Sequence, residues 1–179
     1  MKKVDLLARA IIDLKQVEPN VARMVEDELF LDAAAYHLQQ GIEKIMKYVI
    51  NSNGEKFNKT HKILELCQSM DGYNIRYPEW LYENAELLTS YAEDTRYSDD
   101  LVGNKRKVLE LLDLAFSYAS AVKQEEEQIQ DDYDAAGIGK TSADNKPSTP
   151  NDYTKIGGYN VADYKEAPHI YLDENSSDA

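Results

Sequence analysis

The sequence contains a single cysteine, Cys67, among its 179 residues, so no disulfide can form within the chain. A chain without disulfides suits a reducing compartment, and we expect a cytoplasmic location. No apolar run approaches the roughly 18 residues that a membrane-spanning helix needs. The opening segment MKKVDLLARAIIDLKQ is interrupted by Asp5, Arg9 and Asp13, a pattern that favours an amphipathic helix over a signal peptide. We therefore expect no association with a membrane.

Positive charge is also scarce in this chain. It has 20 lysine and arginine residues against 33 aspartate and glutamate residues, which gives a formal net charge of −13. A protein that binds duplex DNA broadly needs a basic surface to neutralise the phosphates, so we expect no such surface here. A small local site for one nucleotide or a short RNA remains compatible with this charge.

Common catalytic and cofactor-binding motifs are missing. The sequence has no GxxxxGK[ST] phosphate loop, no HExxH or CxxC pair, and no DxDxDG calcium loop. The segment GIGKT, residues 137–141, lacks the first glycine of a phosphate loop at the required spacing. We therefore predict no catalytic residue, no metal ligand and no cofactor.

Apolar residues recur at helical spacing, and no segment alternates with the period of a strand, which predicts an all-α fold. We expect about five helices, which cover residues 6–14, from 21 or 26 to 51, a short stretch after Thr60, 78–97, and 108–122 with an end near 125–127. Pro19 and Asn20 are expected to interrupt the chain between the first two. Short connections between such helices favour an antiparallel up-down bundle.

The composition changes near residue 129. Residues 129–179 are rich in Asp, Asn, Ser, Gly, Pro and Tyr and contain few large aliphatic side chains. Such a segment cannot bury enough apolar surface to offset the entropy lost on ordering. We predict a helical bundle over residues 1–128 and an acidic, disordered tail over residues 129–179.

Polar residues border the apolar stripe of the second helix. His37, Gln40 and Lys44 lie along one border at about 100° per residue. They indicate either a polar pocket beside the core, with Lys44 available for a phosphate, or a His37–Gln40 hydrogen bond with Lys44 extended into water. Periodicity alone favours the second interpretation. The adjacent pair Glu43 and Lys47 is more simply a solvated helix face.

Two further segments carry groups that suit an anion. His61 follows Thr60 in the predicted first turn of a helix, where free backbone N–H groups favour an anion. A surface histidine beside a capping threonine is the favoured interpretation of this segment alone. Arg96 and Tyr97 end the fourth predicted helix. They suit a phosphate-plus-base site, or an internal salt bridge with the acidic residues around them.

Three segments resemble elements of the HEPN domain (higher eukaryotes and prokaryotes nucleotide-binding). LDAAAYHLQQGIEKIMKYVI, residues 31–50, resembles the family's second helix, NKTHKILEL, residues 58–66, its Lys-Thr-His-x-Leu element, and TRYSD, residues 95–99, its Ala-Arg-Tyr-Pro stretch. The resemblance covers about residues 4–125. The matching positions in the first segment are Asp32, Ala33, Tyr36, His37, Gln39, Gln40, Glu43 and Lys44.

The resemblance implies an up-down helical bundle, often a homodimer, and three kinds of function. These are the partner of a minimal nucleotidyltransferase, often in a toxin–antitoxin pair, a metal-independent ribonuclease, and a non-catalytic nucleotide- or RNA-binding module. The ribonuclease needs an arginine followed four to six residues later by a histidine. Arg96 is followed by YSDDLVGNKRK, and no histidine occurs between His61 and His169. Ser98 also stands where the family commonly has proline.

We therefore expect a non-catalytic module that binds a nucleotide or RNA, forms a homodimer, and pairs with a minimal nucleotidyltransferase. The alternatives are a ribonuclease toxin with a degenerate motif and a structural scaffold. The residues expected to bind the phosphate-bearing ligand are Lys44, His61, Arg96 and Tyr97, with His37 and Gln40 in support.

Overall fold

The computed structural model describes residues 5–94 and 103–135 of the chain, and the ordered elements in this part are all helices. The helices are α1 (Leu6–Leu14), α2 (Val17–Arg23), α3 (Leu29–Ser52), α4 (Ile63–Gly72), α5 (Glu79–Glu83), α6 (Ala85–Glu93) and α7 (Lys105–Ala135). The all-α prediction is confirmed. The described part has more helices than the five expected, because two of the predicted segments are divided differently.

The divisions have local causes. Pro19 does not interrupt the chain but lies in the first turn of α2, where a proline removes no helical hydrogen bond. The expected fourth helix is split into α5 and α6 at Asn84, whose side-chain Nδ2 donates to the carbonyl oxygen of Trp80 at 2.7 Å. Residues with short polar side chains favour such local breaks because they bond to the nearby backbone.

The last helix is longer than expected. Instead of ending near residue 127, α7 continues to Ala135. Side-chain hydrogen bonds one turn apart support this extension, from Gln128 to Asp132 at 2.9 Å and from Gln130 to Asp134 at 2.8 Å. Residues 129–135, which were assigned to the tail, are thus part of α7. The boundary between bundle and tail and the disorder of residues 136–179 stay predictions, since residues 136–179 lie outside the described residues.

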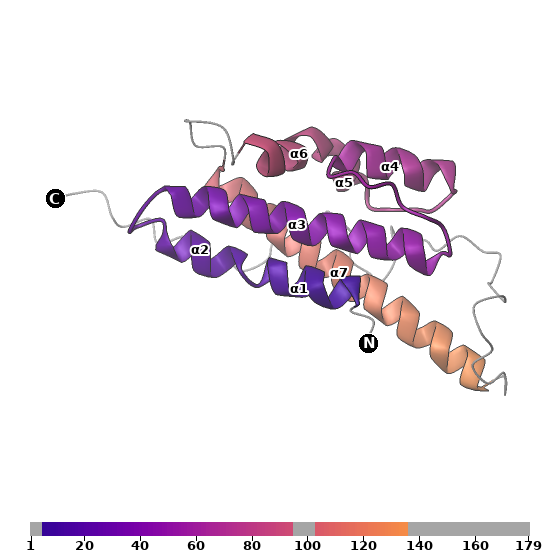
Figure 1. Cartoon of the computed structure of the whole chain (residues 1–179). Coiled ribbons are helices and arrows are strands. Elements are labelled where there is room, and N and C mark those ends of the chain that lie inside the picture. Colours follow the sequence, from indigo (N-terminus) through magenta and orange to yellow (C-terminus); the bar gives the residue numbers. More distant parts are fainter. Residues whose placement is uncertain (1–4, 95–102, 136–179) are drawn as a thin grey trace.

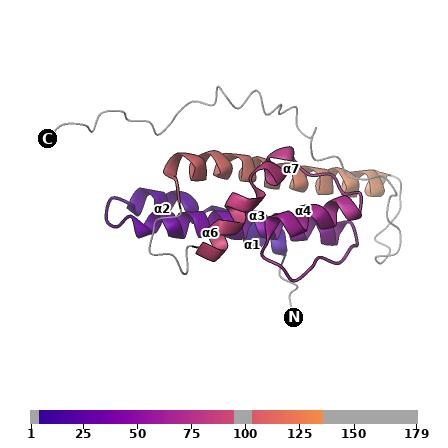
Figure 2. The ribbon, with the colours of Figure 1, turned by 90° about the horizontal axis from the view of Figure 1, so that it is seen from above.

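The helices form four passes along the bundle. In Figure 1, α1 and α2 together run opposite to α3, then α4, α5 and α6 return, and α7 passes behind α3. Figure 2 shows the same bundle from above, with α7 beside the layer that contains α3. Helix α3 contacts α1, α2, α4, α6 and α7. It is therefore the central helix, and most of its side chains have to be accommodated inside the protein.

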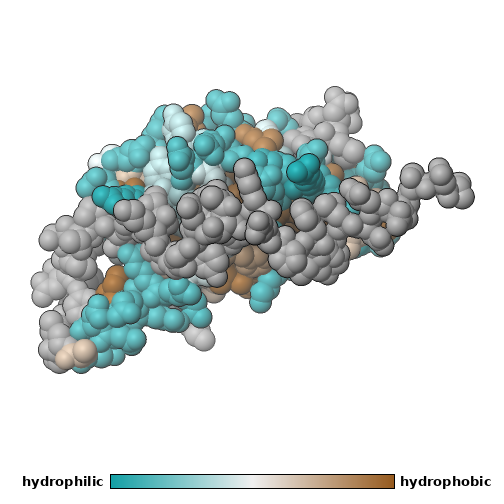
Figure 3. All heavy atoms as spheres, turned by 180° about the vertical axis from the view of Figure 1, so that it is seen from behind, coloured by the Kyte–Doolittle hydropathy of each residue, from teal (hydrophilic) through white to brown (hydrophobic). Residues whose placement is uncertain are grey.

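One face of the bundle is predominantly hydrophilic where the described residues are visible (Figure 3). On the face in Figure 3, teal covers most of what is visible of the described residues, and the brown areas are small. No helix in the described ranges is both long and apolar enough to cross a membrane.

A glycine allows α3 to approach α1 closely. A Cβ atom at Gly41 would lie 2.5 Å from Cδ2 of Leu14 and 3.2 Å from the carbonyl oxygen of Ala10. Both distances are shorter than ordinary van der Waals contacts, and Leu14 is fully buried. Because packed interiors yield little, a side chain at this position would push the two helices apart.

We predict that Gly41→Ala lowers the free energy of unfolding by about 1–3 kcal/mol, because overpacking outweighs the better helix propensity of alanine. The matched control is Gly72→Ala at the end of α4, where a Cβ atom would meet no heavy atom within 4 Å. The control should be neutral or more stable. Urea unfolding monitored by circular dichroism measures both, and equal stability of the two variants would contradict the close approach.

Candidate functional site

A carboxylate of α1 holds two polar residues of α3. Oδ2 of Asp13 lies 2.8 Å from Nζ of Lys44, and Oδ1 lies 3.3 Å from Nδ1 of His37. All three side chains are partly exposed, between 20% and 33%. His37 therefore faces Asp13 and not Gln40, and Lys44 is neutralised by a carboxylate instead of extending freely into water.

Two glutamine amides continue the network along α3. Nζ of Lys44 donates to Oε1 of Gln40 at 3.1 Å, and Nε2 of Gln40 donates to Oε1 of Gln39 at 2.7 Å. Nε2 of Gln39 then donates to Oε2 of Glu43 at 3.0 Å. Each amide accepts on one side and donates on the other, so the chain of hydrogen bonds runs unbroken from Asp13 to Glu43.

The expectation of a solvated face for Glu43 and Lys47 is wrong. The two residues are only 4% and 9% exposed, and Nζ of Lys47 lies 2.7 Å from Oε1 of Glu43. The cover is the connection between α3 and α4, because Lys47 also donates to the carbonyl oxygen of Thr60 at 2.6 Å. No sequence pattern within α3 predicts the burial of Glu43 and Lys47, because the segment that covers them follows the end of the helix.

Glu43 is held in its ionised form. Burial raises its pKa, but hydrogen bonds from Lys47 and Gln39, together with the charge of Lys47, act in the opposite direction and outweigh it. The pKa of Glu43 therefore lies below its ordinary value of 4.5. A buried carboxylate with these partners is a fixed negative charge in the site.

His61 lies at the outer end of the network. Its Nδ1 is 3.1 Å from Oε2 of Glu43, and its side chain is 70% exposed. Its backbone carbonyl oxygen accepts from Nε2 of Gln39 at 3.0 Å. Nε2 of Gln40 is 3.5 Å from the same Oε2 of Glu43. Lys44 and His61 are thus joined through Gln40 and Glu43.

The structure places four of the six residues expected from the sequence, His37, Gln40, Lys44 and His61, in this one network. Arg96 and Tyr97 lie outside the described residues. The sequence did not identify Asp13 as part of the site, because its partners His37 and Lys44 lie on a different helix, α3. Asp32, one of the positions that match the family's second helix, is buried at the start of α3 and accepts from the backbone N–H of Gly103 at 2.8 Å, a partner that the sequence did not indicate.

The arrangement suits binding of an anion at the exposed imidazole. Nδ1–H of His61 donates to the Glu43 carboxylate, so Nε2 is the nitrogen left for a ligand, and Nε2 donates to an anion when the imidazole carries both protons. Lys59 and Lys62 flank His61 and are exposed. In the described ranges, no three His, Cys, Asp or Glu side chains are grouped so that they could hold a metal ion.

The comparisons with known proteins identify a family. The model of the HEPN domain matches residues 4–125, the same range over which the three sequence segments resemble that family. No curated protein and no solved structure gives a significant match.

We predict that Glu43→Gln lowers the free energy of unfolding by about 2–4 kcal/mol, because it leaves the charge of Lys47 buried without its partner. The matched control is Glu127→Gln, which breaks an exposed pair with Lys123 at 3.6 Å on α7. That change should cost less than about 0.5 kcal/mol. Guanidinium chloride unfolding at neutral pH compares the two, and similar losses would show that Glu43 is not a buried ion-pair partner.

The difference in stability between the native protein and Glu43→Gln should depend on pH. Since the pKa of Glu43 is lowered by folding, its stabilisation is fully present above its ordinary value of 4.5 and is lost as the pH falls through the lowered value. We expect a constant difference from neutral pH to about 5, and a shrinking one below about 4.5. A difference that grows on acidification would contradict the ionised state of Glu43.

Proposed function

We propose a non-catalytic binding function for this chain, which belongs to the HEPN family. In this proposal the protein binds a phosphate-bearing ligand, a nucleotide or a short RNA, at the outer end of the α3 network. The observation that carries it is the continuous set of hydrogen bonds that joins Lys44 to His61 through Gln40 and Glu43. Arg96 and Tyr97, which belong to the same motif set in the sequence, would complete the site.

The fixed position of His61 supports this proposal. Two side chains of α3 hold the backbone beside the imidazole, with Lys47 bound to Thr60 and Gln39 bound to His61 itself. The imidazole is therefore presented to solvent from an anchored segment. A group that is already in place loses little conformational freedom on binding, which favours affinity for the ligand.

The sequence supports a binding role over an enzymatic one. General acid–base catalysis typically accelerates a reaction by a factor of about 10²–10⁴. In this family's ribonuclease branch it needs an imidazole beside the reacting phosphate. No histidine follows Arg96 at the required spacing. The hydroxyl groups of Thr95 and Ser98 cannot replace an acid–base group that titrates near neutral pH.

The family also suggests partners, which we include in the proposal. We propose a cytoplasmic homodimer paired with a minimal nucleotidyltransferase. Three exposed aliphatic side chains support an interface, one on α1, one in the connection between α2 and α3, and one at the start of α3. They are Ile12, Val25 and Leu29, at 61%, 90% and 64% exposure. Apolar groups this accessible are more stable when a partner covers them.

Calorimetry with AMP, ATP and a short single-stranded RNA tests the binding site. Loss of one charge-assisted hydrogen bond costs about 1.5–3 kcal/mol, so His61→Gln and Lys44→Gln should each weaken binding by roughly tenfold or more. The matched control is Lys123→Gln, a cation that is 63% exposed on α7, and it should leave binding unchanged. Absence of binding for the whole panel, or equal affinity in all three variants, would reject the site.

Incubation of the protein with labelled RNA in EDTA tests the non-catalytic assignment separately. We expect intact RNA. Cleavage that is lost in Arg96→Ala would instead establish the metal-independent ribonuclease.

A further inference from the structure

The connection between α3 and α4 contains a basic segment, residues 56–62. Its sequence KFNKTHK has three lysines and no acidic residue, in a chain whose net charge is −13. All three lysines are exposed. Lys62 lies 3.9 Å from Glu65, whereas Lys56 and Lys59 make no ion pair with any residue in the ranges 5–94 and 103–135. The positive charge of this segment is therefore largely available to a ligand.

The basic segment is held in place beside α4. Oη of Tyr73 donates to the carbonyl oxygen of Lys56 at 3.2 Å, and Nδ2 of Asn58 donates to Oγ of Ser69 at 3.3 Å. The partly buried ring of Phe57 packs against the core. Figure 1 shows the connection passing along α4, and these contacts run from the end of that helix towards its start. The lysines are thus carried on an anchored backbone.

An exposed aromatic ring lies at the opposite end of the segment from His61. Tyr73 follows the last residue of α4 and is 42% exposed. The hydrogen bond from its hydroxyl to Lys56 holds the ring beside the first lysine of the segment. Sites for single-stranded nucleic acids combine such rings, on which bases stack, with cations that contact the phosphates. A free phosphate or an acidic peptide would use the lysines but not the ring.

We propose that the basic segment and Tyr73 form a strand-binding surface for a short single-stranded RNA, with a phosphate at His61 and a base stacked on Tyr73. The surface rests on the proposed function, since His61 is common to both, and it makes the ligand a strand instead of a mononucleotide. Helix α4 has 10 residues, so it is about 15 Å long. Successive phosphates of a stacked strand are about 3.4 Å apart, so this length takes about four nucleotides.

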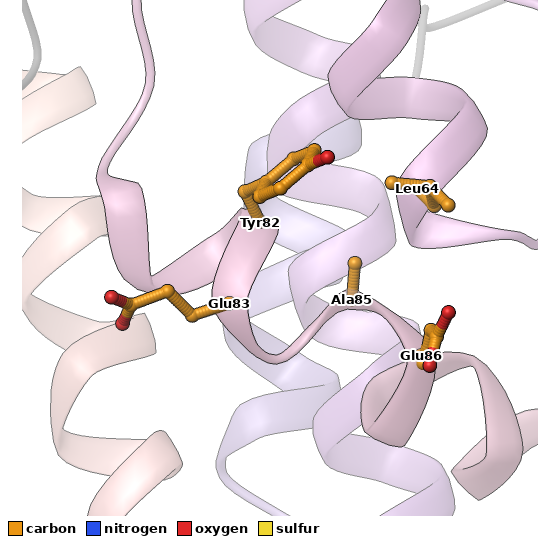
Figure 4. A pocket seen from close by; sticks show the side chains of 5 residues that line it. All are labelled: Leu64, Tyr82, Glu83, Ala85 and Glu86. Atoms are coloured by element: carbon orange, nitrogen blue, oxygen red, sulfur yellow. The ribbon is translucent and has the colours of Figure 1, made fainter.

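A second exposed tyrosine shows why the ring alone does not make such a surface. Tyr82 of α5 is 55% exposed and lies at a hollow that Glu83 and Glu86 also line (Figure 4). The charged residues of that lining are both acidic, so they would repel the phosphates of a strand whose base stacked on Tyr82. Tyr73 differs because lysines lie beside it, and Tyr82 is therefore a matched control.

Calorimetry of the full chain with AMP and with hexa-adenylate RNA tests the stacked base. The hexamer should bind at least about fivefold more tightly than AMP, because one stacked base contributes at least that factor. Tyr73→Leu should remove this advantage and leave AMP binding unchanged, whereas Tyr73→Phe keeps the ring and should bind like the native protein. Tyr82→Leu should leave both ligands unchanged. Equal weakening in Tyr73→Leu and Tyr73→Phe would overturn the stacking.

The salt dependence of hexamer binding tests the lysines. Lys56→Gln/Lys59→Gln should weaken the hexamer and make the slope of log affinity against log salt shallower by about 1.4, since each lost phosphate contact removes about 0.7. The control Lys15→Gln/Lys123→Gln removes the same charge from two exposed lysines outside the segment and should keep the native slope. Equal slopes in the two double variants would show attraction by net charge alone and would overturn the proposal.

Further outcomes separate this surface from the proposed function. AMP binding that needs His61, together with a hexamer that binds no more tightly than AMP, would keep the proposed function and reject the surface. Hexamer binding that needs Tyr73 but is unchanged in His61→Gln would instead support the stacked base and reject the phosphate site at His61. Hexa-glutamate that binds as tightly as the hexamer would overturn the proposal, because the segment would then be a site for an acidic peptide.

Discussion

The burial of α3 is the constraint on which both the fold and the candidate site depend. Five other helices contact it, so polar side chains along its length have to find partners inside the protein. On the side of Glu43 and Lys47 the cover is not a helix but the connection between α3 and α4. An irregular backbone brings its own unpaired carbonyl groups, and these must be satisfied as well. Gln39 and Lys47 meet both requirements at once, because they bind the carbonyl oxygens of His61 and Thr60.

The same contacts that complete the core therefore position the exposed imidazole. His61 is not placed by a helix of its own, since it precedes the first residue of α4. Its position comes from Glu43 on one side and from the Gln39 amide on the other. Stability and ligand binding are consequently coupled at this point of the molecule. Changes in neighbouring members of the network should not be additive, as is usual for residues that share partners.

Helical periodicity was sufficient to predict much of the fold. The apolar stripe of α3 identifies Leu38, Ile42, Ile45 and Val49, all of which are fully buried. Three features could not be predicted from the spacing of apolar residues, because they depend on distant segments or on the solvent-facing side of a helix. Glu43 is buried by residues that come after the helix ends. The partner of His37 comes from α1, and the extension of α7 is supported by polar pairs that periodicity of apolar residues does not detect.

For the site, the sequence indicated which polar positions matter but not their partners. A family resemblance names residue types in order, and it therefore selected Lys44 and His61 while giving no reason to include Asp13. Only the crossing of α1 and α3, at Gly41, brings that carboxylate to Lys44. A lysine in the sequence indicates an anion site only when its neighbours are known. Here the Asp13 carboxylate, 2.8 Å from Nζ of Lys44, offsets the positive charge that a ligand would meet.

The balance of charge in the network explains how an acidic chain can present a site for an anion. Asp13 and Glu43 offset Lys44 and Lys47, so these four residues together contribute no net charge. The local field near His61 then depends on Lys59 and on Lys62, whose Nζ lies 3.9 Å from Oε1 of Glu65. Screening at physiological salt limits exposed charges to a range of about 8 Å, so acidic residues elsewhere on the bundle have little effect there. A long nucleic acid would cover much of the surface, so the total charge of −13 strongly opposes its binding. The same charge opposes the binding of a single phosphate group at one end of α3 far less.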